Sequence, residues 1–433
     1  MIEAGLRQKE VEIAVLVAVQ FPGDSDDDTA DSLDELGALA RTAGAEVSCS
    51  IIQRRNRYEP ATAIGKGKIS EIEKSVRSAG AQIAIFDNEL TVTQQERLQS
   101  LLDSKVIDRT ALILDIFAQH AHTSEGRTQV ELAQLNYLLH RIRGKGVELS
   151  RLGGGIGTRG PGETQLEVDR RRIRRRMRRL EKDLTQMESV RANQRKQRKR
   201  AGLPSICLIG YTNSGKSSLL NRLTGASVLT EDQLFSTLDS ITRRLVLPDG
   251  QKVVLSDTVG FIRKLPHELI AAFRSTLEVV READLLAHVV DATAENSYAE
   301  RMSAVNDVLF DLDASDIPMM MVVNKVDLLE PVQTEYIKRA YPDALHVSAL
   351  TGEGIDALVE AMAKRLPGPT RVALAVPAAK GDILSALYRD GLVLSREVKD
   401  EKVLVTVNLP PEKLGEYRRY ISQETEQANN CHL

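Results

Sequence analysis

The segment from Gly210 to Ser217 constrains the fold of this chain more than any other feature of its sequence. It reads Gly-Tyr-Thr-Asn-Ser-Gly-Lys-Ser, which fits the pattern GxxxxGK[ST], and it lies between the apolar run 205–210 and the helix-like run 218–223. A glycine-rich loop between a strand and a helix lets backbone N–H groups wrap a phosphate. The context therefore predicts a phosphate loop, in which Lys216 contacts the β- and γ-phosphates and Ser217 offers its hydroxyl to Mg²⁺.

Two segments further along the chain can discriminate between bases. Asn324-Lys-Val-Asp327 follows the apolar run 319–323. The Asp327 carboxylate can accept hydrogen bonds from the ring N–H and the exocyclic amine of guanine, a pair that adenine cannot offer. Ser348-Ala-Leu350 could place backbone N–H groups on the carbonyl oxygen of the base, or it could be a plain strand-to-loop turn. The order of these motifs after the phosphate loop predicts GTP and GDP as ligands.

Two segments between these motifs are typical of a nucleotide-dependent switch. Asp257-Thr-Val-Gly260 follows the apolar run 252–256, so that Asp257 would reach Mg²⁺ through water and the Gly260 N–H would sense the γ-phosphate. Thr237 lies within 235–239, and its hydroxyl can complete the Mg²⁺ shell only when the γ-phosphate is present. Both segments would be ordered with the triphosphate and released after hydrolysis.

The sequence thus predicts a full set of nucleotide contacts. Lys216, Thr237 and Asn213 are the catalytic candidates, and Ser217, Thr237 and, through water, Asp257 are the candidate Mg²⁺ ligands. The predicted nucleotide-binding residues are Gly210, Tyr211, Thr212, Asn213, Ser214, Gly215, Lys216, Ser217, Phe235, Ser236, Thr237, Leu238, Asp239, Asp257, Thr258, Val259, Gly260, Asn324, Lys325, Val326, Asp327, Ser348, Ala349 and Leu350.

The predicted catalytic machinery lacks one familiar part. In Ras-type switches a glutamine follows the glycine of DxxG and orients the attacking water, whereas this chain has Phe261. We therefore expect slow intrinsic hydrolysis. The side-chain oxygen of Asn213 could hold a monovalent cation such as K⁺ near the β/γ bridge, or it could merely stabilise the loop. His267 is expected to be structural rather than catalytic.

Basic residues are concentrated in one part of the chain. Residues 170–200 contain 15 Lys and Arg against 3 Asp and Glu, so the near-neutral net charge of -3 conceals a local excess. Apolar residues at heptad spacing on both sides of the Gly-rich run 152–163 predict an antiparallel helical hairpin with this run at its tip. The charge indicates an anionic partner, although a solvated helical face would have the same composition. If the partner is RNA, the predicted contacts are Arg159, Arg170, Arg171, Arg172, Arg174, Arg175 and Arg176.

Alternation of apolar runs with helical stretches predicts an α/β protein. Strands are expected at 12–19, 46–52, 82–87, 205–210, 252–256, 285–290 and 319–323, and the first three are separated by helices at 31–43, 68–79 and 92–103. The four predicted domains are a small parallel α/β domain (1–107), the helical hairpin (108–200), a P-loop GTPase domain (203–366) and a small α+β domain with the order βαββα (370–433).

Composition excludes several other classes of protein. The three cysteines, Cys49, Cys207 and Cys431, are far apart, so neither a disulfide framework nor a structural zinc site is expected. The apolar run 11–19 contains Glu12 and is too short to span a bilayer. We therefore expect a cytoplasmic protein without a membrane span.

Six stretches of the sequence resemble the HflX family of bacterial ribosome-associated GTPases. They are residues 57–72, 106–121, 154–172, 210–219, 234–239 and 257–277. The stretch Gly-Gly-Ile-Gly-Thr-Arg-Gly-Pro-Gly-Glu at 154–163, with the Asp-Arg-Arg that trails it, is highly specific to that family, whereas the nucleotide motifs alone are not. The carboxyl-terminal region is less distinctive.

The resemblance implies partners that the motifs alone do not identify. Members of this family bind the large ribosomal subunit, reach the peptidyl-transferase region with the hairpin, and are thought to split or rescue stalled ribosomes under stress. It also implies that Asn213 is a K⁺-ligand candidate and that ribosomes stimulate hydrolysis. Two alternatives are a large-subunit assembly factor that uses GTP as an occupancy timer, and a nucleotide-dependent RNA remodeller that works through its first domain. We expect a monomer when the protein is off the ribosome.

Overall fold

The chain is an α/β protein with two compact units in the computed structural model. The structure describes residues 11–152, 165–200, 202–226, 234–235, 240–264, 266, 274–294, 298–368, 370–399 and 401–422. Unit 1 comprises residues 1–185, 231–238 and 263–273, and unit 2 comprises residues 186–230, 239–262 and 274–433. The two short segments in unit 1 are the ones that flank or contain the predicted switch residues. The four predicted domains therefore remain a proposal about the organisation of the chain.

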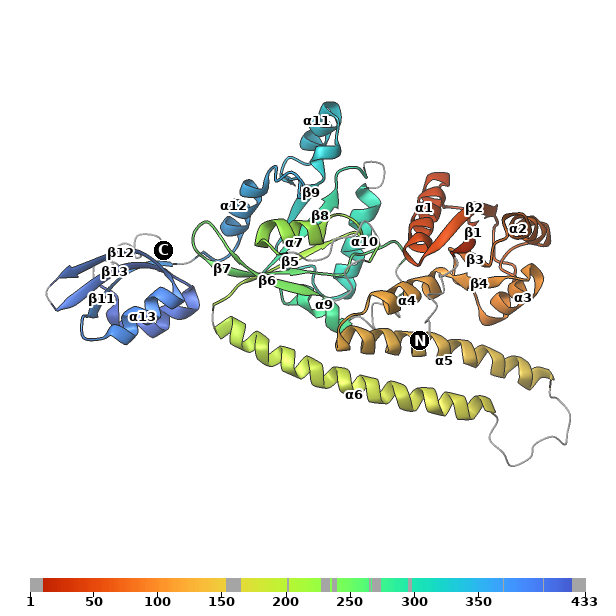
Figure 1. Cartoon of the computed structure of the whole chain (residues 1–433), viewed down its shortest axis with the longest axis horizontal. Helices are drawn as coiled ribbons and strands as arrows, with labels where there is room; N and C mark the ends of the chain where they lie inside the picture. Colours follow the sequence, from red (N-terminus) through yellow and green to blue (C-terminus); the bar gives the residue numbers. More distant parts are fainter. Residues whose placement is uncertain are drawn as a thin grey trace, which may run out of the picture. The chain divides into compact units, whose positions relative to one another are not determined.

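Unit 1 is built around a four-stranded parallel sheet with the order β2-β1-β3-β4. The strands are β1 (Glu12–Gln20), β2 (Ala45–Arg54), β3 (Ile83–Phe86) and β4 (Lys105–Asp108), and the helices around them are α1 (Asp26–Thr42), α2 (Lys66–Ala79), α3 (Val92–Leu102) and α4 (Arg109–His120). Helices α1 and α4 contact each other, as do α2 and α3, and the two pairs cover opposite faces of the sheet (Figure 1). Because both faces are covered, β1 is apolar and buried from Ala14 to Val19.

The predicted strands of unit 1 are confirmed, but β4 was missed. This strand has only four residues, Lys-Val-Ile-Asp, which is too short for a recognisable apolar run. Helix α1 also begins earlier than residue 31, because the Ser25 hydroxyl accepts a hydrogen bond from the Asp28 N–H (2.9 Å) and caps the helix. The Gly-Lys-Gly-Lys run at 65–68 starts α2, with Gly65 at the cap position.

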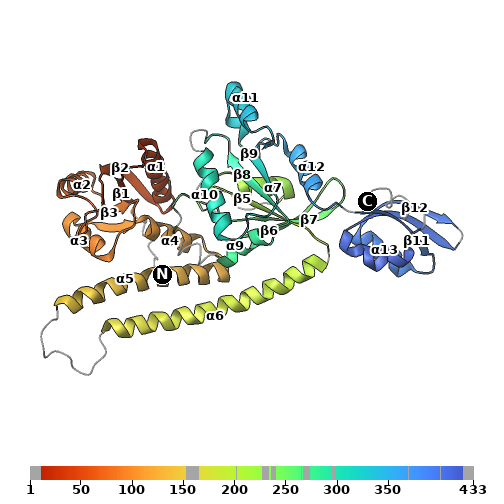
Figure 2. The same cartoon turned by 180° about the vertical axis from the view of Figure 1, so that it is seen from behind.

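The predicted helical hairpin consists of α5 (Ser124–Leu152) and α6 (Gln165–Arg200). Figure 1 and Figure 2 show α5 beside the part of α6 that belongs to unit 1. Leu132 of α5 and Leu180 and Leu184 of α6 form one buried cluster, against which Leu135 and Met177 pack. The two apolar seams therefore meet, as the heptad spacing predicted. Residues 153–164 of the Gly-rich tip lie outside the described residues.

Unit 2 contains a six-stranded sheet with the order β10-β9-β8-β5-β7-β6. Five strands run parallel, and β6 pairs antiparallel with β7 at the edge. The strands are β5 (Ser205–Gly210), β6 (Ile241–Val246), β7 (Lys252–Asp257), β8 (Leu285–Asp291), β9 (Met319–Asn324) and β10 (Leu345–His346). The surrounding helices are α7 (Lys216–Thr224), α9 (Arg274–Arg281), α10 (Tyr298–Asp311), α11 (Pro331–Ala340), α12 (Ile355–Arg365) and the short η2 (Val326–Leu328).

The sequence pattern identified most strands of this sheet and missed the edge strand β6. Strands β5, β7, β8 and β9 coincide with the predicted apolar runs, and β10 coincides with a short strand expected to end at Val347, whereas β6 was not predicted. Strand β6 carries the exposed Arg243 and Arg244, which is typical of an edge strand protected by charge and gives no apolar run. Strand β10 has only two residues.

The carboxyl-terminal part of unit 2 is a second, smaller sheet with the order β11-β13-β12. Strands β11 (Thr370–Pro377), β12 (Leu392–Lys399) and β13 (Lys402–Leu409) are antiparallel, and α13 (Gly381–Asp390), η3 (Pro411–Lys413), α14 (Leu414–Tyr417) and η4 (Arg418–Tyr420) complete it. Alternate residues of β13 are buried, which is the pattern of a sheet covered on one face. The predicted α+β order is confirmed.

No helix among the described residues is both long and apolar enough to cross a lipid bilayer.

Candidate nucleotide-binding site

The predicted phosphate loop connects β5 to α7, and its backbone explains its glycines. Gly210 and Gly215 have positive φ angles of 148° and 86°, and Asn213 has a φ of 58°. A Cβ atom on Gly210 would overlap the Val289 carbonyl oxygen, and one on Gly215 would overlap the side-chain amide of Asn324. Both positions therefore require glycine for space as well as for conformation.

Lys216 supplies a buried positive charge inside this loop. Its side chain is 6% exposed, and its Nζ donates hydrogen bonds to the carbonyl oxygens of Gly210 (3.1 Å) and Tyr211 (2.7 Å). Burial lowers the pKa of Lys216 to about 8, although the Asp257 carboxylate acts in the opposite direction. An ammonium group that has lost its hydration in this way gains most from an anionic ligand such as a phosphate.

Two of the three residues predicted to hold Mg²⁺, Ser217 and Asp257, come together at the start of α7 and the end of β7. Ser217 Oγ donates to Asp257 Oδ2 at 2.5 Å. The hydroxyls of Thr212 and Ser214 are buried and make no hydrogen bond within the part of the chain that the structure describes. Hydroxyl and carboxylate oxygens are ligands that Mg²⁺ prefers, and unsatisfied buried hydroxyls fit a polar ligand in the loop. The donor set therefore fits a Mg²⁺–phosphate group.

The segment after β7 lies directly against the phosphate loop. The Phe261 N–H donates to the Gly210 carbonyl (3.1 Å), and the Thr212 N–H donates to the Phe261 carbonyl (2.8 Å). A Cβ on Gly260 would lie 2.7 Å from Thr212 Cα, so only glycine allows this approach. The Thr258 hydroxyl donates to the Leu208 carbonyl (2.8 Å) and fixes the start of the segment. This segment is thus tied to the loop by its backbone.

The side chain at the position of the missing glutamine points into the core. Phe261 is 2% exposed, so it contributes no polar group to the nucleotide site. This agrees with the expectation that the chain lacks a water-orienting side chain at this position.

Asn324 joins two loops of the site through its side chain. Its Nδ2 donates to the Ser214 carbonyl (2.9 Å), and its Oδ1 accepts from the Ala349 N–H (3.0 Å). Asn324 is 1% exposed, so both groups are used inside the protein. The motif predicts that Asn324 and the Ala349 N–H contact the nucleotide, and in this structure they bond the phosphate loop and the 348–350 loop to each other.

Asp327, the residue predicted to select guanine, is exposed. It lies on the exposed side of η2 and its carboxylate makes no hydrogen bond or ion pair within the described residues, whereas Val326 beside it is buried. Lys325 has a φ of 66°, and its Nζ forms an ion pair with Asp291 Oδ2 at 2.8 Å. These contacts hold the turn that presents the Asp327 carboxylate.

The 348–350 loop is fixed by backbone contacts. The buried Ser348 accepts at Oγ from the Thr351 N–H (3.0 Å), while its own N–H donates to the Glu353 carbonyl (2.9 Å). Leu350 is 80% exposed and contacts no core. Of the three residues, Ser348 therefore determines the conformation of the loop.

Some predicted residues are not placed by the structure. Arg159, Ser236, Thr237, Leu238, Asp239 and His267 lie outside the described residues. Phe235 is described and belongs to unit 1. The roles of Thr237 in catalysis and Mg²⁺ binding therefore remain predictions.

Two arginines that support the site carried no recognisable signal in the sequence. The Arg301 guanidinium lies over the Tyr211 ring of the phosphate loop, 5.1 Å from its centroid. Arg222 of α7 donates to the Thr351 carbonyl (3.0 Å) beside the 348–350 loop. Each lies on a helix among other polar residues, so neither its type nor its spacing distinguishes it.

The basic face of α6 contains both exposed and paired arginines. Arg171, Arg172, Arg174 and Arg175 are exposed. Arg172 also lies 3.8 Å from Asp169 of the same helix, and Arg176, which is exposed as well, forms a two-pronged ion pair with Glu131 of α5, at 2.6 and 2.7 Å. Arg176 therefore also connects the two helices of the hairpin, in addition to its predicted contact with RNA.

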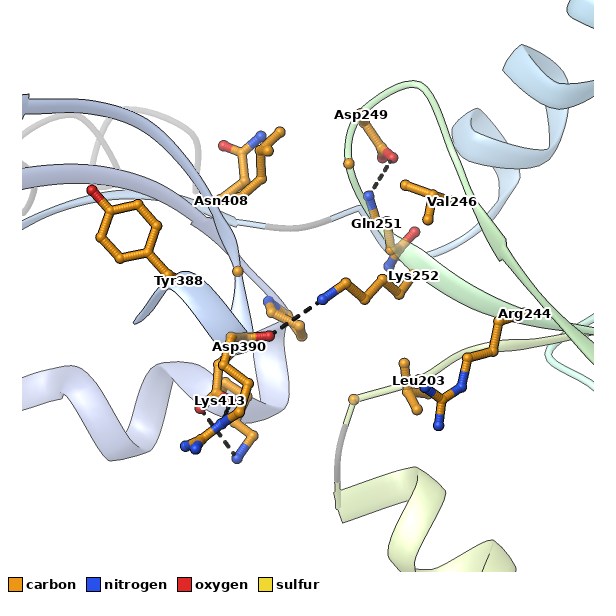
Figure 3. Close-up of a pocket in the computed structure, with 16 residues that line it drawn as sticks. Leu203, Arg244, Val246, Asp249, Gln251, Lys252, Tyr388, Asp390, Asn408 and Lys413 are labelled. Carbon is orange, nitrogen blue, oxygen red and sulfur yellow. Dashed lines mark hydrogen bonds and ion pairs between the residues drawn. The ribbon is translucent and has the colours of Figure 1, made fainter. Parts of the chain in front are cut away.

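Figure 3 shows a second cavity of unit 2, which shares no residue with the nucleotide motifs. It has a volume of about 530 Å³ and lies between the β6–β7 turn and the carboxyl-terminal sheet. Lys252 Nζ donates across it to the Arg389 carbonyl (3.4 Å), and Asp390 at its edge accepts from Tyr417 (2.8 Å). The carboxylate and ammonium groups that line this cavity thus largely bond with other side chains or with the backbone.

Comparison with known proteins identifies the family. Models described as "GTP-binding GTPase N-terminal", "GTP-binding GTPase Middle Region", "50S ribosome-binding GTPase" and "HflX C-terminal domain" match residues 30–118, 120–198, 205–325 and 337–430. GTPase HflX of Caldanaerobacter subterraneus subsp. tengcongensis is 45% identical over 414 residues, covering 95% of this chain and 94% of that protein. The chain belongs to the HflX family of GTPases. GTPase HflX of Escherichia coli K12 is 42% identical over 417 residues, covering 95% and 96%.

Membership of the HflX family gives the site its chemistry. The chain is a P-loop enzyme that binds GTP and hydrolyses it, and HflX-type GTPases of this class generally depend on Mg²⁺. A solved structure of a GTP-binding protein from Sulfolobus solfataricus in complex with GDP is 23% identical, has a TM-score of 0.42, and covers 82% of this chain and 98% of that one.

Proposed function

We propose that this GTPase binds the large ribosomal subunit through the basic face of α6 and splits or rescues stalled ribosomes under stress. The observation that carries the proposal is the row of exposed guanidinium groups at Arg171, Arg172, Arg174 and Arg175 in a chain whose remainder is acidic. The description "50S ribosome-binding GTPase" of the model that matches residues 205–325 supports the large subunit as the partner.

The charge distribution supports ribosomal RNA rather than a free nucleotide as the ligand of α6. Guanidinium groups bind phosphates at two points, and a row of them on one helix matches a row of backbone phosphates. An acidic remainder weakens binding to RNA through other faces. We therefore infer that contact with the ribosome is confined to the hairpin, and that Arg159 at its tip and the partly buried Arg170 add to it.

We infer that binding to the ribosome depends on which nucleotide occupies the nucleotide site. Mg²⁺, when bound by Ser217 and Thr237 with Asp257 behind water, would neutralise charge on the β- and γ-phosphates. Lys216 binds the same phosphates, Gly260 detects the γ-phosphate through its N–H, and Asp327 selects guanine. Because Phe261 provides no group to orient water, hydrolysis would be slow until a cation at Asn213, such as K⁺, or the ribosome completes the site.

A direct test is light scattering of purified intact ribosomes. We expect scattering to fall when the protein is added with a non-hydrolysable GTP analogue, because splitting halves the mass of the particles. With GDP the fall should be much smaller. Unchanged scattering at saturating protein, with binding to immature large subunits instead, would favour an assembly factor that uses GTP as a timer.

A charge variant separates the RNA contacts from the GTPase. We expect replacement of Arg171, Arg172, Arg174 and Arg175 by Gln to weaken ribosome binding and to lower the slope of log K against log salt by up to about 4. The matched control replaces four exposed basic residues of unit 2, Lys338, Arg339, Lys364 and Arg365, by Gln. Identical binding by the two variants across a salt series would remove the role of α6.

A protein that binds ribosomes must be in the same compartment as the ribosomes. We propose that it acts in the cytoplasm and is a monomer when it is not on the ribosome. Sedimentation of the purified protein without ribosomes tests the second point, and a dimer at micromolar concentration would contradict it.

A further inference from the structure

The cavity of about 530 Å³ in unit 2 contains polar groups that neither the nucleotide motifs nor the basic face of α6 uses. We call it the β6–β7 cavity. Arg244, Gln251 and Lys252 line it from β6, β7 and the turn between them, and Tyr388 and Asn408 line it from α13 and β13 (Figure 3). Its volume lies within the range of small-molecule sites, about 300–1,000 Å³.

Close contacts determine the shape of this cavity. Gly250 in the β6–β7 turn has a φ of 81°, and a Cβ atom on it would overlap the Leu392 side chain at the start of β12. The Gln251 Nε2 donates to the Pro367 carbonyl (2.8 Å), which precedes β11. The turn is thus packed and bonded against the carboxyl-terminal part of unit 2, so the cavity is a built feature of this unit.

The acidic groups of the cavity already have partners. Asp390 accepts from the Tyr417 hydroxyl (2.8 Å) and from Arg389 Nε (3.2 Å). Burial raises the pKa of Asp390, but these hydrogen bonds outweigh burial and hold this pKa below its ordinary value. Asp249 Oδ1 accepts from the Gln251 N–H (3.0 Å). Neither carboxylate therefore requires a further cation.

Two basic groups of the cavity lack such strong partners. The Arg244 side chain lines the cavity and makes no hydrogen bond or ion pair within the part of the chain that the structure describes. Lys252 Nζ donates to the Arg389 carbonyl at 3.4 Å, which is longer than an ordinary N–H···O bond of about 2.7–3.2 Å. Both groups can therefore bind an anion without breaking a salt bridge.

Gln251 adds an acceptor that has no donor. Its side chain is 5% exposed, and its Oε1 accepts no hydrogen bond from the described residues. The orientation of the amide is fixed, because its nitrogen must face the Pro367 carbonyl. A buried acceptor without a donor is costly, so Oε1 favours a ligand that carries an O–H or N–H group.

We propose that the β6–β7 cavity binds a small phosphorylated polyol, such as a sugar phosphate. A phosphate monoester carries two negative charges, which match the Arg244 guanidinium and the Lys252 ammonium, whereas a carboxylate carries one. A hydroxyl of the polyol donates to Gln251 Oε1, and the Tyr388 ring, 53% exposed, offers an apolar surface to the carbon skeleton. The proposal is independent of the proposed function, because the cavity shares no residue with the nucleotide motifs.

Isothermal titration calorimetry of the full-length chain tests the proposal, with GDP and Mg²⁺ in small excess over the protein so that the nucleotide site is filled. We expect ribose 5-phosphate to bind at one saturable site with a Kd below about 1 mM. Ribose should not bind, and inorganic phosphate should bind at least about fivefold more weakly, because it has no carbon skeleton to contact Tyr388. No binding of ribose 5-phosphate, or equal binding of either comparison compound, would overturn the proposal.

Two neighbouring arginines of β6 provide matched variants. Arg244→Gln removes a cation from the cavity, and we expect the Kd for ribose 5-phosphate to rise at least about tenfold. Arg243→Gln makes the same change of charge one residue away, at an exposed position outside the cavity lining, and its Kd should equal that of the unmodified chain. Unchanged GDP affinity shows that both variants fold. Equal Kd values for the two variants would overturn the proposal.

A third variant separates this site from the phosphate loop. Lys216→Ala should lose affinity for GDP and still bind ribose 5-phosphate with an unchanged Kd, because Lys216 does not line the β6–β7 cavity. Loss of ribose 5-phosphate binding in Lys216→Ala would show that the sugar phosphate binds in the phosphate loop and would overturn the proposal. Tight GDP binding by Lys216→Ala would instead refute the assignment of the phosphate loop.

Discussion

The two larger sheets of this chain each bury a cation and an anion at the carboxyl ends of their strands. In unit 2 Lys216 of the loop after β5 is buried together with Asp257 at the end of β7, and in unit 1 Asp87 and Arg109 are buried at the ends of β3 and β4. Loops diverge at the carboxyl ends of parallel strands in both cases, which leaves space for a ligand. The two places differ in how the cation is paired, because Lys216 donates to backbone carbonyl oxygens whereas Arg109 forms a direct ion pair with Asp87.

Removal of the buried cation should have the largest effect. We expect Lys216→Ala to weaken GTP binding at least a thousandfold, because the phosphates lose their buried counter-charge (~4 kcal/mol). Equilibrium titration with a fluorescent GTP analogue measures this. Lys338→Ala, at an exposed position of the same unit, should leave the affinity unchanged. Tight binding by Lys216→Ala would show that the loop does not hold phosphate.

Removal of the Asp327 carboxylate, which is proposed to select guanine, should have the second-largest effect on GTP binding. Asp327→Ala should weaken GTP binding by at least about a hundredfold, since two hydrogen bonds to a charged acceptor are lost (~1.5–3 kcal/mol each). The affinity for ATP should be unaffected, which a competition titration can show. Asp343→Ala, another exposed aspartate of unit 2, is the control. An equal loss for ATP would contradict base selection by Asp327.

Removal of the buried anion should affect stability rather than nucleotide affinity. Asp87→Ala removes one of the two carboxylates that pair with Arg109 and the carboxylate that pairs with Lys264. We expect a loss of about 3 kcal/mol in the free energy of unfolding, measured by urea denaturation. Asp115→Ala, exposed on α4, should change it by less than about 0.5 kcal/mol. Equal stabilities would show that the cluster is not charge-balanced by Asp87.

The smallest expected effect is a pH dependence that only the cationic site should show. Burial lowers the pKa of Lys216 to about 8, so the ammonium form that phosphate requires is depleted as the pH rises through this value. Affinity for GDP should therefore fall about fourfold from pH 6.5 to pH 8.5. In Lys216→Arg the charge persists, and whatever affinity remains should be constant over this range. Tighter binding at higher pH would contradict the assignment.

The phosphate loop was predictable because the residues that form it are consecutive in the sequence. Eight consecutive residues fix the backbone, the cation and the first Mg²⁺ ligand, and the apolar runs of β5, β7, β8 and β9 place them in a parallel sheet. Each of these patterns is local, so it can be recognised in the sequence without knowledge of the fold. The α5–α6 seams were predictable for the same reason.

The buried polar cluster around Asp87 was not predictable because its residues are distant in the chain. Ser32, Asp87, Arg109 and Lys264 are ordinary polar residues until the fold brings them together, and Lys264 follows the switch motif with no pattern of its own. Asn324 shows a related limit, since its motif predicts a contact with the base while its amide joins two loops. Edge strands such as β6 lack an apolar run because one side faces solvent.

Co-sedimentation with separated ribosomal subunits tests the account most directly. We expect the protein to pellet with purified large subunits in the presence of a non-hydrolysable GTP analogue, much less with GDP, and not with small subunits. The variant that replaces Arg171, Arg172, Arg174 and Arg175 by Gln should remain in the supernatant while still binding the analogue. Equal pelleting with both subunits, or pelleting that does not depend on the nucleotide, would contradict a GTP-dependent large-subunit factor.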